Sequence, residues 1–302
     1  MSDRRKGLLY GLSAYLLWGL FPLYWPLLEP AGPLEILANR IIWSLVVVVV
    51  LLAVTRNWAW LSGVVRNRRQ MLLLSAAAIT ITLNWGTYIY GVNSEQVVQT
   101  ALGYFINPLV SILFGVLLLK ERLRRWQWIA VGLGALAVLV LTLDYGHPPW
   151  IALVLAFSFG TYGLLKKTLN MGTVESLAVE TGLLFVPALG FLVYLQSQGE
   201  NTLSQEGPRH AALLVTTGFV TAVPLLFFGA AATRIPLTWL GLVQYIAPVI
   251  QFMIGVFLYN EPMPASRWFG FVLVWSALVL IALESIVAHR RSATDALRPI
   301  TE

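Results

Sequence analysis

Apolar residues run along this chain in long stretches, and short polar or charged segments separate the stretches. A helix needs about 20 mainly apolar residues to cross the hydrocarbon core of a bilayer. Eight suitable stretches contain no charged residue: 7–28, 70–94, 96–119, 126–143, 148–165, 181–199, 211–233 and 235–260. Two more, 34–55 and 268–288, qualify if Arg40 and Glu284 lie inside the span. The pattern predicts an all-α polytopic membrane protein with ten transmembrane helices.

The composition agrees with this interpretation and excludes several other classes of protein. Of the 302 residues, 58% are hydrophobic and 11% are charged, whereas an ordinary soluble domain carries about 25% charged residues. A soluble enzyme, a nucleic-acid-binding module and a disordered chain are therefore excluded, and membrane lipid is the expected surrounding. The chain has no cysteine, and its three histidines lie outside the apolar stretches. No metal site and no cofactor are predicted.

Lysine and arginine residues fall mainly on one side of the predicted spans. With the N-terminus in the cytoplasm, 17 basic residues lie in cytoplasmic loops and ends, whereas Arg209 and Arg267 lie outside. Cytoplasmic loops of membrane proteins carry such an excess of basic residues. A miscount of one span would move every later loop to the other side and remove the bias. The charges therefore predict ten spans with both termini in the cytoplasm.

The sequence repeats itself weakly at one constant spacing, which is the separation between Gly32 and Gly172. We call this spacing the repeat offset. The matches with most weight in an apolar sequence pair Gly32 with Gly172, Glu35 with Glu175, Pro108 with Pro248, Gly115 with Gly255, Glu121 with Glu261 and Trp128 with Trp268. Each half contains five spans, and an odd number makes the second half enter the membrane in the opposite orientation. We predict two inverted repeats, 1–145 and 146–288, and a cytoplasmic tail, 289–302. Many secondary transporters have this architecture, with the substrate site between the repeats.

Polar and aromatic side chains lie inside the predicted spans at helical spacing. Tyr104 and Asn107 share one face of the fourth span, and Gln244 and Gln251 lie on the corresponding face of the ninth. Amides are costly in hydrocarbon unless they are hydrogen-bonded, so these faces should point away from lipid. Hydrogen bonds between helices are the alternative to a substrate cavity. The candidate substrate contacts are Trp18, Asn84, Tyr88, Tyr104, Asn107, Tyr162, Gln244, Tyr245 and Gln251.

Pro108 and Pro248 lie near the centres of the fourth and ninth spans. A proline inside a helix removes the hydrogen bond to the carbonyl four residues earlier, here that of Tyr104 or Gln244. Such a carbonyl must face protein or a wet cavity, because lipid cannot satisfy it. A packing kink satisfied by a neighbouring helix is the alternative.

Glu121 and Glu261 follow the fourth and ninth spans and precede the next helices. A carboxylate in this position can cap a helix N-terminus and complement its dipole. We therefore favour a structural role for both residues over substrate binding.

Two charged residues at repeat-related positions lie within spans. Arg40 lies about six residues from the outer end of the second span, or ~9 Å deep, and Glu180 lies at a similar depth from the cytoplasmic end of the seventh. Because they are near opposite faces of the membrane, a direct ion pair between them is not expected. Intramembrane charges are functional hypotheses, although long side chains can also reach the interface. We predict a structural or gating role for Arg40 and consider a proton-linked role for Glu180.

Several motifs occur in a characteristic order: Trp18–Tyr24, Glu35–Ser44, Ala101–Pro108, Lys120–Leu123, Ser158–Gly163, Glu180–Thr181, Thr221–Leu225 and Gln244–Pro248. In this order they resemble the RarD-type branch of the EamA permeases, within the drug/metabolite transporter superfamily. The resemblance covers nearly all of the chain except the loop 197–210 and the C-terminal tail. It implies ten helices from a duplicated five-helix unit. It also implies export of small metabolites or drugs across the bacterial inner membrane.

The leading functional prediction is a secondary active transporter whose halves alternate access around a midplane cavity. Aromatic and amide-rich contacts suit neutral or zwitterionic, partly apolar small molecules. The chain has no Walker A motif, so an ion gradient or the gradient of the substrate must drive transport. The alternatives are a non-transporting scaffold or lipid-handling protein and, least favoured, an intramembrane enzyme, because no His, Cys or Asp lies deep in a span. The sequence leaves open the substrate, the coupling ion and whether the protein forms a homodimer.

Overall fold

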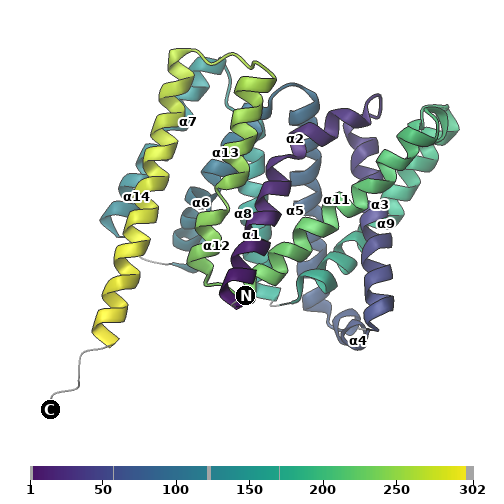
Figure 1. The fold of residues 1–302 in the computed structure, drawn as a ribbon, viewed down its shortest axis with the longest axis horizontal. Coiled ribbons are helices and arrows are strands. Elements are labelled where there is room, and N and C mark those ends of the chain that lie inside the picture. Colours follow the sequence, from purple (N-terminus) through teal and green to yellow (C-terminus); the bar gives the residue numbers. More distant parts are fainter. Residues whose placement is uncertain (1–2, 57, 121–123, 170, 297–302) are drawn as a thin grey trace.

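The computed structural model describes residues 3–56, 58–120, 124–169 and 171–296, which form helices and no β-strand (Figure 1). In chain order the helices are α1 (Asp3–Gly19), α2 (Phe21–Tyr24), the 3₁₀ helix η1 (Trp25–Leu28), α3 (Pro33–Thr55), α4 (Ala59–Arg66), α5 (Arg68–Asn93), α6 (Val97–Leu119), α7 (Arg125–Tyr145), α8 (Trp150–Leu169), α9 (Thr173–Gln198), α10 (Thr202–Gln205), α11 (Pro208–Ala232), α12 (Leu237–Val243), α13 (Ile246–Met253), the π-helix η2 (Ile254–Leu258) and α14 (Ala265–Ala296). The predicted all-α class is confirmed for these residues.

Eight helices in the described part of the chain are long and apolar enough to cross a membrane. They are α3, α5, Val97–Leu117 of α6, α7, α9, α11, the run Trp239–Leu258, and Ala265–Glu284 of α14. Helix α1 gives a ninth span if it is joined to Phe21–Leu28, from which a bend of 44° separates it. Helix α8, which corresponds to the sixth predicted span, carries Lys166 and Lys167 in its last turn and is not among these helices. The count of ten therefore stays a prediction.

Helices in the two halves of the chain begin at matching positions. The matching starts are Pro33 and Thr173 (α3 and α9), Arg68 and Pro208 (α5 and α11), Val97 and Leu237 (α6 and α12), and Arg125 and Ala265 (α7 and α14). The spacing within every pair equals the repeat offset of the sequence. Lys120 and Asn260, which are related by the same offset, both adopt the left-handed backbone conformation, with φ of 55° and 52°. The periodicity of the sequence is thus also present in the backbone.

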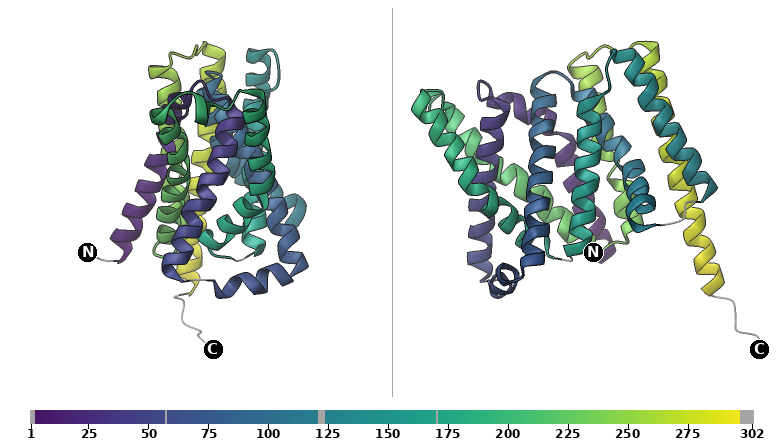
Figure 2. Two further views of the ribbon diagram at one scale, coloured as in Figure 1. Left: turned by 90° about the vertical axis from the view of Figure 1, so that its right-hand side faces the viewer. Right: turned by 180° about the vertical axis from the view of Figure 1, so that it is seen from behind.

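The interhelical contacts have the same relation between the halves. Helix α3 packs against α9, α6 against α13 and α7 against α14, so that each of these helices meets its own counterpart. Helix α8 packs against α5 and α6, and α1 correspondingly packs against α11 and α13. The pair α7–α14 forms one edge of the molecule and the pair α3–α9 the opposite edge (Figures 1 and 2). Helices α1, α5, α6 and α8, which carry most of the candidate contacts, lie between these edges.

Glycines allow close approach at two of these helix crossings. A Cβ atom on Gly218 of α11 would clash with the carbonyl oxygen of Trp43 on α3. A Cβ atom on Gly103 of α6 would lie 2.9 Å from the carbonyl oxygen of Ala152 on α8. Membrane helices associate through such contacts between small residues, because lipid supplies no hydrophobic force between them.

The two repeat-related spans that contain Pro108 and Pro248 differ in continuity. Helix α6 continues through Pro108, whereas the ninth span is divided into α12, α13 and η2. The division falls at Gln244 and Tyr245, just before the turn that Pro248 enters, as the missing backbone hydrogen bond leads one to expect. Discontinuous helices and π-helical turns are frequent at functional sites of membrane proteins.

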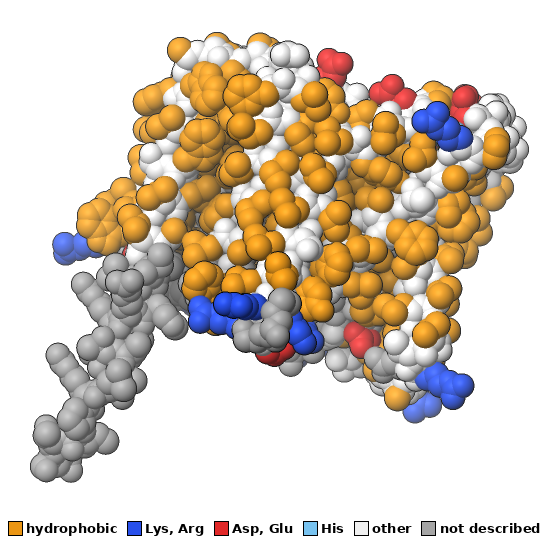
Figure 3. Space-filling view, in the orientation of Figure 1, with side chains coloured by type: hydrophobic (Ala, Val, Ile, Leu, Met, Phe, Trp, Pro, Cys, Tyr) orange, Lys and Arg blue, Asp and Glu red, His pale blue; other side chains and the backbone are white. Residues whose placement is uncertain are grey.

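Charged side chains lie mainly at the two ends of the helices. Hydrophobic side chains cover the middle of the face shown in Figure 3, and Lys and Arg gather along the lower edge, where the N-terminus lies. Ion pairs join α7 and α14 at both ends: Arg124 Nη1 lies 2.6 Å from Glu284 Oε1, and Arg267 Nε lies 2.9 Å from Asp144 Oδ2. The two carboxylates, at positions 144 and 284, are again related by the repeat offset.

Candidate functional site

Asn84 of α5 connects three helices in the middle of the molecule. Its Nδ2 donates hydrogen bonds to the carbonyl oxygen of Leu155 (3.1 Å) and to Oγ of Ser158 (3.0 Å), both on α8. Its Oδ1 accepts a hydrogen bond of 3.3 Å from the hydroxyl group of Tyr104 on α6. The side chain of Asn84 is 1% exposed. These bonds are the interhelical kind that the sequence left open as the alternative to a substrate contact.

A row of aromatic side chains runs from the neighbours of Asn84 toward α9. The ring centroids of Tyr88 and Tyr104 are 5.7 Å apart, those of Tyr104 and Phe159 are 6.0 Å apart, and those of Phe159 and Tyr162 are 6.3 Å apart. These are distances at which aromatic rings attract each other. Three of the candidate contacts, Tyr88, Tyr104 and Tyr162, therefore belong to one connected group.

A second group joins α1 to the broken ninth span. Gln251 is 3% exposed, and its Nε2 donates a hydrogen bond of 3.0 Å to the carbonyl oxygen of Trp18. Gln244 and Tyr245 are half-buried at the break between α12 and α13. The structure thus places the predicted contacts in two groups, one on α5, α6 and α8 and one on α1, α12 and α13.

Two amide oxygens in these groups are buried without a partner among the described residues. They are Oδ1 of Asn107 and Oε1 of Gln251. A Cβ atom on Gly160 would lie 3.5 Å from Oδ1 of Asn107, so this amide faces α8. A buried acceptor without a donor costs about 1–3 kcal/mol, which makes both oxygens candidates for contact with a polar ligand.

The guanidinium group of Arg40 on α3 is enclosed by aromatic rings. Its Cζ lies 4.0 Å from the ring centroid of Trp85, 5.1 Å from that of Trp25 and 5.8 Å from that of Phe21. Its Nε donates a hydrogen bond of 2.8 Å to Oγ1 of Thr221 on α11. The side chain is 3% exposed, and no carboxylate in the described part of the chain forms an ion pair with it.

These contacts compensate the burial of Arg40 only in part. Removing a charge from water costs several kcal/mol even after the protein relaxes. A cation–π contact returns about 0.5–2 kcal/mol, and a hydrogen bond to a neutral hydroxyl group about 1 kcal/mol. Arg40 is therefore stabilised by polarisable neighbours, but its positive charge has no counter-ion among the residues described.

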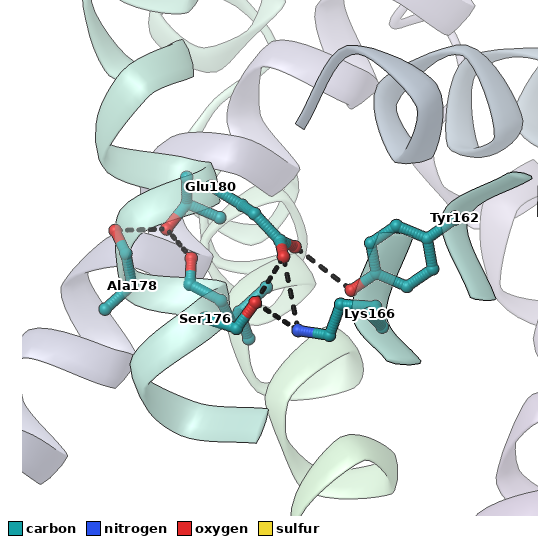
Figure 4. A network of polar contacts seen from close by, with 7 residues as sticks. Tyr162, Lys166, Ser176, Ala178 and Glu180 are labelled. Atoms are coloured by element: carbon teal, nitrogen blue, oxygen red, sulfur yellow. Dashed lines mark hydrogen bonds and ion pairs between the residues drawn. The ribbon is translucent and has the colours of Figure 1, made fainter. Parts of the chain in front are cut away.

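Glu180 of α9 has a different surrounding, shown in Figure 4. Its Oε1 lies 3.2 Å from Nζ of Lys166, and its Oε2 accepts a hydrogen bond of 3.0 Å from the hydroxyl group of Tyr162. The hydroxyl group of Ser176 donates to Oε1 and also contacts Nζ of Lys166. Glu180 is 1% exposed, so the network forms a buried ion pair with two additional hydroxyl groups.

The sequence did not link Lys166 with Glu180, because it placed Lys166 outside the sixth span. A span that ends at residue 165 leaves Lys166 in a cytoplasmic loop, but α8 continues to Leu169. Helix α9 begins at Thr173 and includes Glu180, which agrees with the expected position of Glu180 inside the seventh span. The spacing of four residues between Tyr162 and Lys166, and between Ser176 and Glu180, was the available signal, since such residues share a helix face.

Glu261 caps a helix, but not the helix that follows it in sequence. Its Oε1 accepts a hydrogen bond of 2.5 Å from the backbone N–H of Val97, and its two oxygens lie 3.2 and 3.1 Å from the N–H of Val98. Both N–H groups belong to the first turn of α6 in the other half. Burial raises the pKa of the Glu261 carboxyl group to about 7, although the two N–H groups and Arg267 lower it. Glu121, expected to have a similar role, lies outside the described residues.

Candidate metal ligands are not grouped in the part of the chain that the structure describes. There, no three His, Cys, Asp or Glu residues come together as they would around a metal ion. The side chains in and next to the two sets of candidate contacts carry amides and hydroxyl groups. They also include the ion pair of Glu180 and the guanidinium group of Arg40. These groups can bind and orient a small molecule.

Fold and site together define a multi-pass α-helical membrane protein with a polar and aromatic interior. A model of the EamA-like transporter family matches residues 5–143 and again residues 149–283. This protein belongs to that family. Its relatives are named as transporters or as RarD proteins, which supports a transporter of the RarD-type branch rather than an enzyme.

Two relatives and one solved structure illustrate the similarity. The chain is 58% identical to "Protein RarD" of Streptomyces exfoliatus over 291 residues, which cover 96% of this chain and 92% of the relative. It is 42% identical to the "Uncharacterized transporter YojE" of Bacillus subtilis, with 96% and 98% covered. A crystal structure titled "Crystal structure of protein" superposes with a TM-score of 0.57 at 15% identity, covering 92% and 96% of the two chains. The last comparison concerns the fold alone.

Proposed function

We propose that this protein is a secondary active transporter that exports small metabolites or drug-like molecules across the bacterial cytoplasmic membrane. The family and the names of the relatives support transport in general. The direction, the location in the inner membrane and the mechanism of alternating access are parts of the proposal. The polar residues of α5, α6 and α8 and those of α1, α12 and α13 would contact the substrate from two sides.

The observation that carries this proposal is the coincidence of four pairs of helix starts at the repeat offset. It supports two five-helix repeats, 1–145 and 146–288, in which α8 is the sixth of ten spans. Residues 289–302 would form a cytoplasmic tail. Five spans per repeat would place the halves in opposite orientations. Opposite orientations allow the same motion to open one side of the membrane and then the other.

The Glu180 network offers a point at which protons could drive this motion. A proton on Glu180 would remove its charge and weaken the contact with Lys166, which joins α9 to α8. In the same step the hydroxyl group of Tyr162 would lose a charged acceptor. The aromatic row connects Tyr162 with Tyr104, so the change would occur next to the proposed substrate contacts.

Transport can be tested before the substrate is identified. Metabolites are compared in cells with and without the protein, and the compounds that change are offered to everted membrane vesicles at controlled pH. An exporter accumulates its substrate in everted vesicles and not in vesicles without the protein. A protein that moves none of these compounds across the sealed membrane would instead fit a scaffold or a lipid-handling role.

Two alanine variants test the substrate contacts. Asn107→Ala and Gln244→Ala should each lower the uptake rate, because each removes an amide from one of the two groups. Ser111→Ala is the matched control, since Ser111 lies one turn after Asn107 but is exposed and bonded to the carbonyl oxygen of Asn107. Normal transport by both amide variants, with normal amounts of folded protein, would refute this site.

The proton-linked role has its own variant. Glu180→Gln should abolish uptake that is driven by a pH gradient, because glutamine cannot exchange a proton. Lys167→Gln is the control, since Lys167 is the exposed neighbour of Lys166. Full pH-driven uptake by the glutamine variant at position 180 would remove the coupling hypothesis and leave transport itself intact.

A further inference from the structure

The buried and half-buried charges of this protein differ in whether the protein itself neutralises them. Glu180 has Lys166 at 3.2 Å, and Arg267 has Asp144 at 2.9 Å. Arg40 is 3% exposed and has no carboxylate partner among the described residues. Its aromatic neighbours and the hydroxyl group of Thr221 are neutral. A fixed cation in such a place favours an anion that comes from outside the chain.

Other donors without acceptors lie around the same guanidinium group. Nε1 of Trp25 and the hydroxyl group of Tyr88 are buried and have no hydrogen-bond partner among the described residues. The ring of Trp25 is 5.1 Å from Cζ of Arg40, and Tyr88 lies near enough to interact with the charge. Both side chains belong to one hydrophobic cluster with Trp85.

The geometry of Arg40 leaves its two Nη groups available. Thr221 accepts from Nε and thereby fixes the orientation of the guanidinium plane. No hydrogen bond joins either Nη group to another residue in the described ranges. A guanidinium group donates through parallel N–H bonds to both oxygens of a carboxylate, which is a strong and directional contact. Arginine, tryptophan Nε1 and a tyrosine hydroxyl group can all donate, so the fitting ligand group is an acceptor of hydrogen bonds.

We propose that the transported substrate carries an oxyanion, specifically a carboxylate, which binds to the Nη groups of Arg40 with Trp25 Nε1 and the Tyr88 hydroxyl group as further donors. This inference rests on the proposed transport function and narrows its substrate class to organic acids and zwitterions. The rings of Phe21 and Trp85 next to Arg40 suit an apolar body attached to the carboxylate. Arg40 is then a substrate-binding residue instead of the structural or gating anchor expected from the sequence.

The test compares acids with neutral amides of the same shape. Binding to the purified full-length protein in a zwitterionic detergent is measured by calorimetry and by thermal stabilisation. The probes are acetate and acetamide, benzoate and benzamide, and phenylacetate and phenylacetamide. At least one acid should bind about tenfold or more tightly than its amide, the ratio expected for a hydrogen-bonded charge. Equal binding of acid and amide in all three pairs, or binding of neither, overturns the proposal.

Two arginine variants locate the effect. Arg40→Gln should remove the preference for the acid, and Arg40→Lys should retain part of it, since lysine keeps the charge but loses the paired N–H groups. Arg267→Gln is the matched control, because Arg267 also lies over an aromatic ring, 4.2 Å from that of Tyr145, but already has a carboxylate partner. Preference for the acid that survives in Arg40→Gln overturns the assignment. If Arg40→Gln does not fold, the acid–amide comparison on the unchanged protein still decides.

An anionic lipid headgroup offers the same chemistry, so it forms a separate arm. Short-chain phosphatidylglycerol and phosphatidylcholine are titrated in the same way. Stabilisation by phosphatidylglycerol that depends on Arg40, without any response to the acids, overturns the proposal in favour of a bound lipid. These binding measurements do not need transport, so a protein that binds acids but moves no solute contradicts the proposed function alone. A transporter that ignores the charge of its substrate contradicts only the inference on Arg40.

Discussion

Arg40 and Glu180 occupy equivalent positions in the two halves, yet their surroundings differ in kind. Glu180 is held by a lysine and two hydroxyl groups, all within the chain. Arg40 is held by aromatic rings and one hydroxyl group, none of which carries a charge. A repeat preserves the positions of backbone elements, but it does not preserve how a buried charge is compensated. The protein itself supplies a counter-ion for Glu180, whereas the charge of Arg40 favours a partner from outside the chain.

The difference has a physical origin in the neighbouring helices. Glu180 obtains Lys166 from α8, one helical turn after Tyr162. The position that the repeat offset relates to Lys166 is Pro26, in the 3₁₀ segment that follows α1 and α2. Proline has no side-chain charge, and the bend at this end of α1 brings Trp25 toward Arg40 instead. The bent first span therefore replaces an ion pair with an aromatic contact.

The largest expected effect comes from separating the ion pair at Glu180. Lys166→Met should lower the free energy of unfolding by about 3–5 kcal/mol, since it leaves a buried carboxylate without its counter-ion. The double variant Lys166→Met with Glu180→Gln should recover most of this loss, because both charges are then absent. Chemical unfolding of the purified proteins in mixed micelles measures both values. Equal destabilisation of the single and double variants would mean that the pair does not act as a unit.

Much of the fold followed from the sequence, because hydrocarbon imposes a strict condition on the backbone. Every polar backbone group in lipid must be paired, so long apolar stretches have to become helices. The repeat offset predicted equivalent helices before their starts were known. The ends of helices were less predictable, because α8 continues beyond residue 165 and includes Lys166, which pairs with Glu180.

The site was harder to predict, since its contacts join residues from distant parts of the chain. Arg40 and Glu180 stood out as charges in apolar stretches. Nothing in the local sequence linked Arg40 with Thr221 or Trp85, and Glu261 caps α6 instead of the helix that follows it. Such partners are set by helix packing, which a helical period does not specify.

Glu261 is a half-buried carboxylate whose partners are backbone N–H groups. Its pKa is raised from 4.5 to about 7 in the folded protein. Between these values the folded protein holds a proton that the unfolded chain has lost. The free energy of unfolding should therefore fall as the pH rises from about 4.5 to about 7, by up to ~3 kcal/mol, and this contribution should be constant outside that window.

Glu261→Gln isolates this contribution, because glutamine does not titrate. The pH profile of the variant is subtracted from that of the unchanged protein, which removes the titration of the neighbouring Glu95 and of other common groups. Arg267 and Asp144 lie close by and are the same in both proteins. A difference that rises with pH, or that is flat between pH 4.5 and 7, would contradict the raised pKa.

Two glycines test how closely each region depends on helix packing. Gly218 precedes Thr221 by one turn and lets α11 approach α3, so Gly218→Ala should cost about 1–3 kcal/mol through overpacking. Gly182 follows Glu180 by two residues, and a Cβ atom there would meet nothing within 4 Å. Gly182→Ala should be neutral or stabilise the protein by up to about 1 kcal/mol. Equal costs in unfolding measurements would show that the Arg40 region does not depend on the close crossing of α11 and α3.

The smallest effect on the free energy of unfolding is expected for a substitution of Arg40. This effect distinguishes the surroundings of Arg40 from those of Glu180. Arg40→Met loses the hydrogen bond to Thr221 and the contacts with aromatic rings, but it also removes the cost of burying an uncompensated charge. Because these terms oppose each other, the free energy of unfolding without ligand should change by less than about 1 kcal/mol. The measurement is the same unfolding experiment that is used for Lys166→Met. A loss as large as that of Lys166→Met would mean that the protein itself fully compensates Arg40, and the cation would then need no partner from outside the chain.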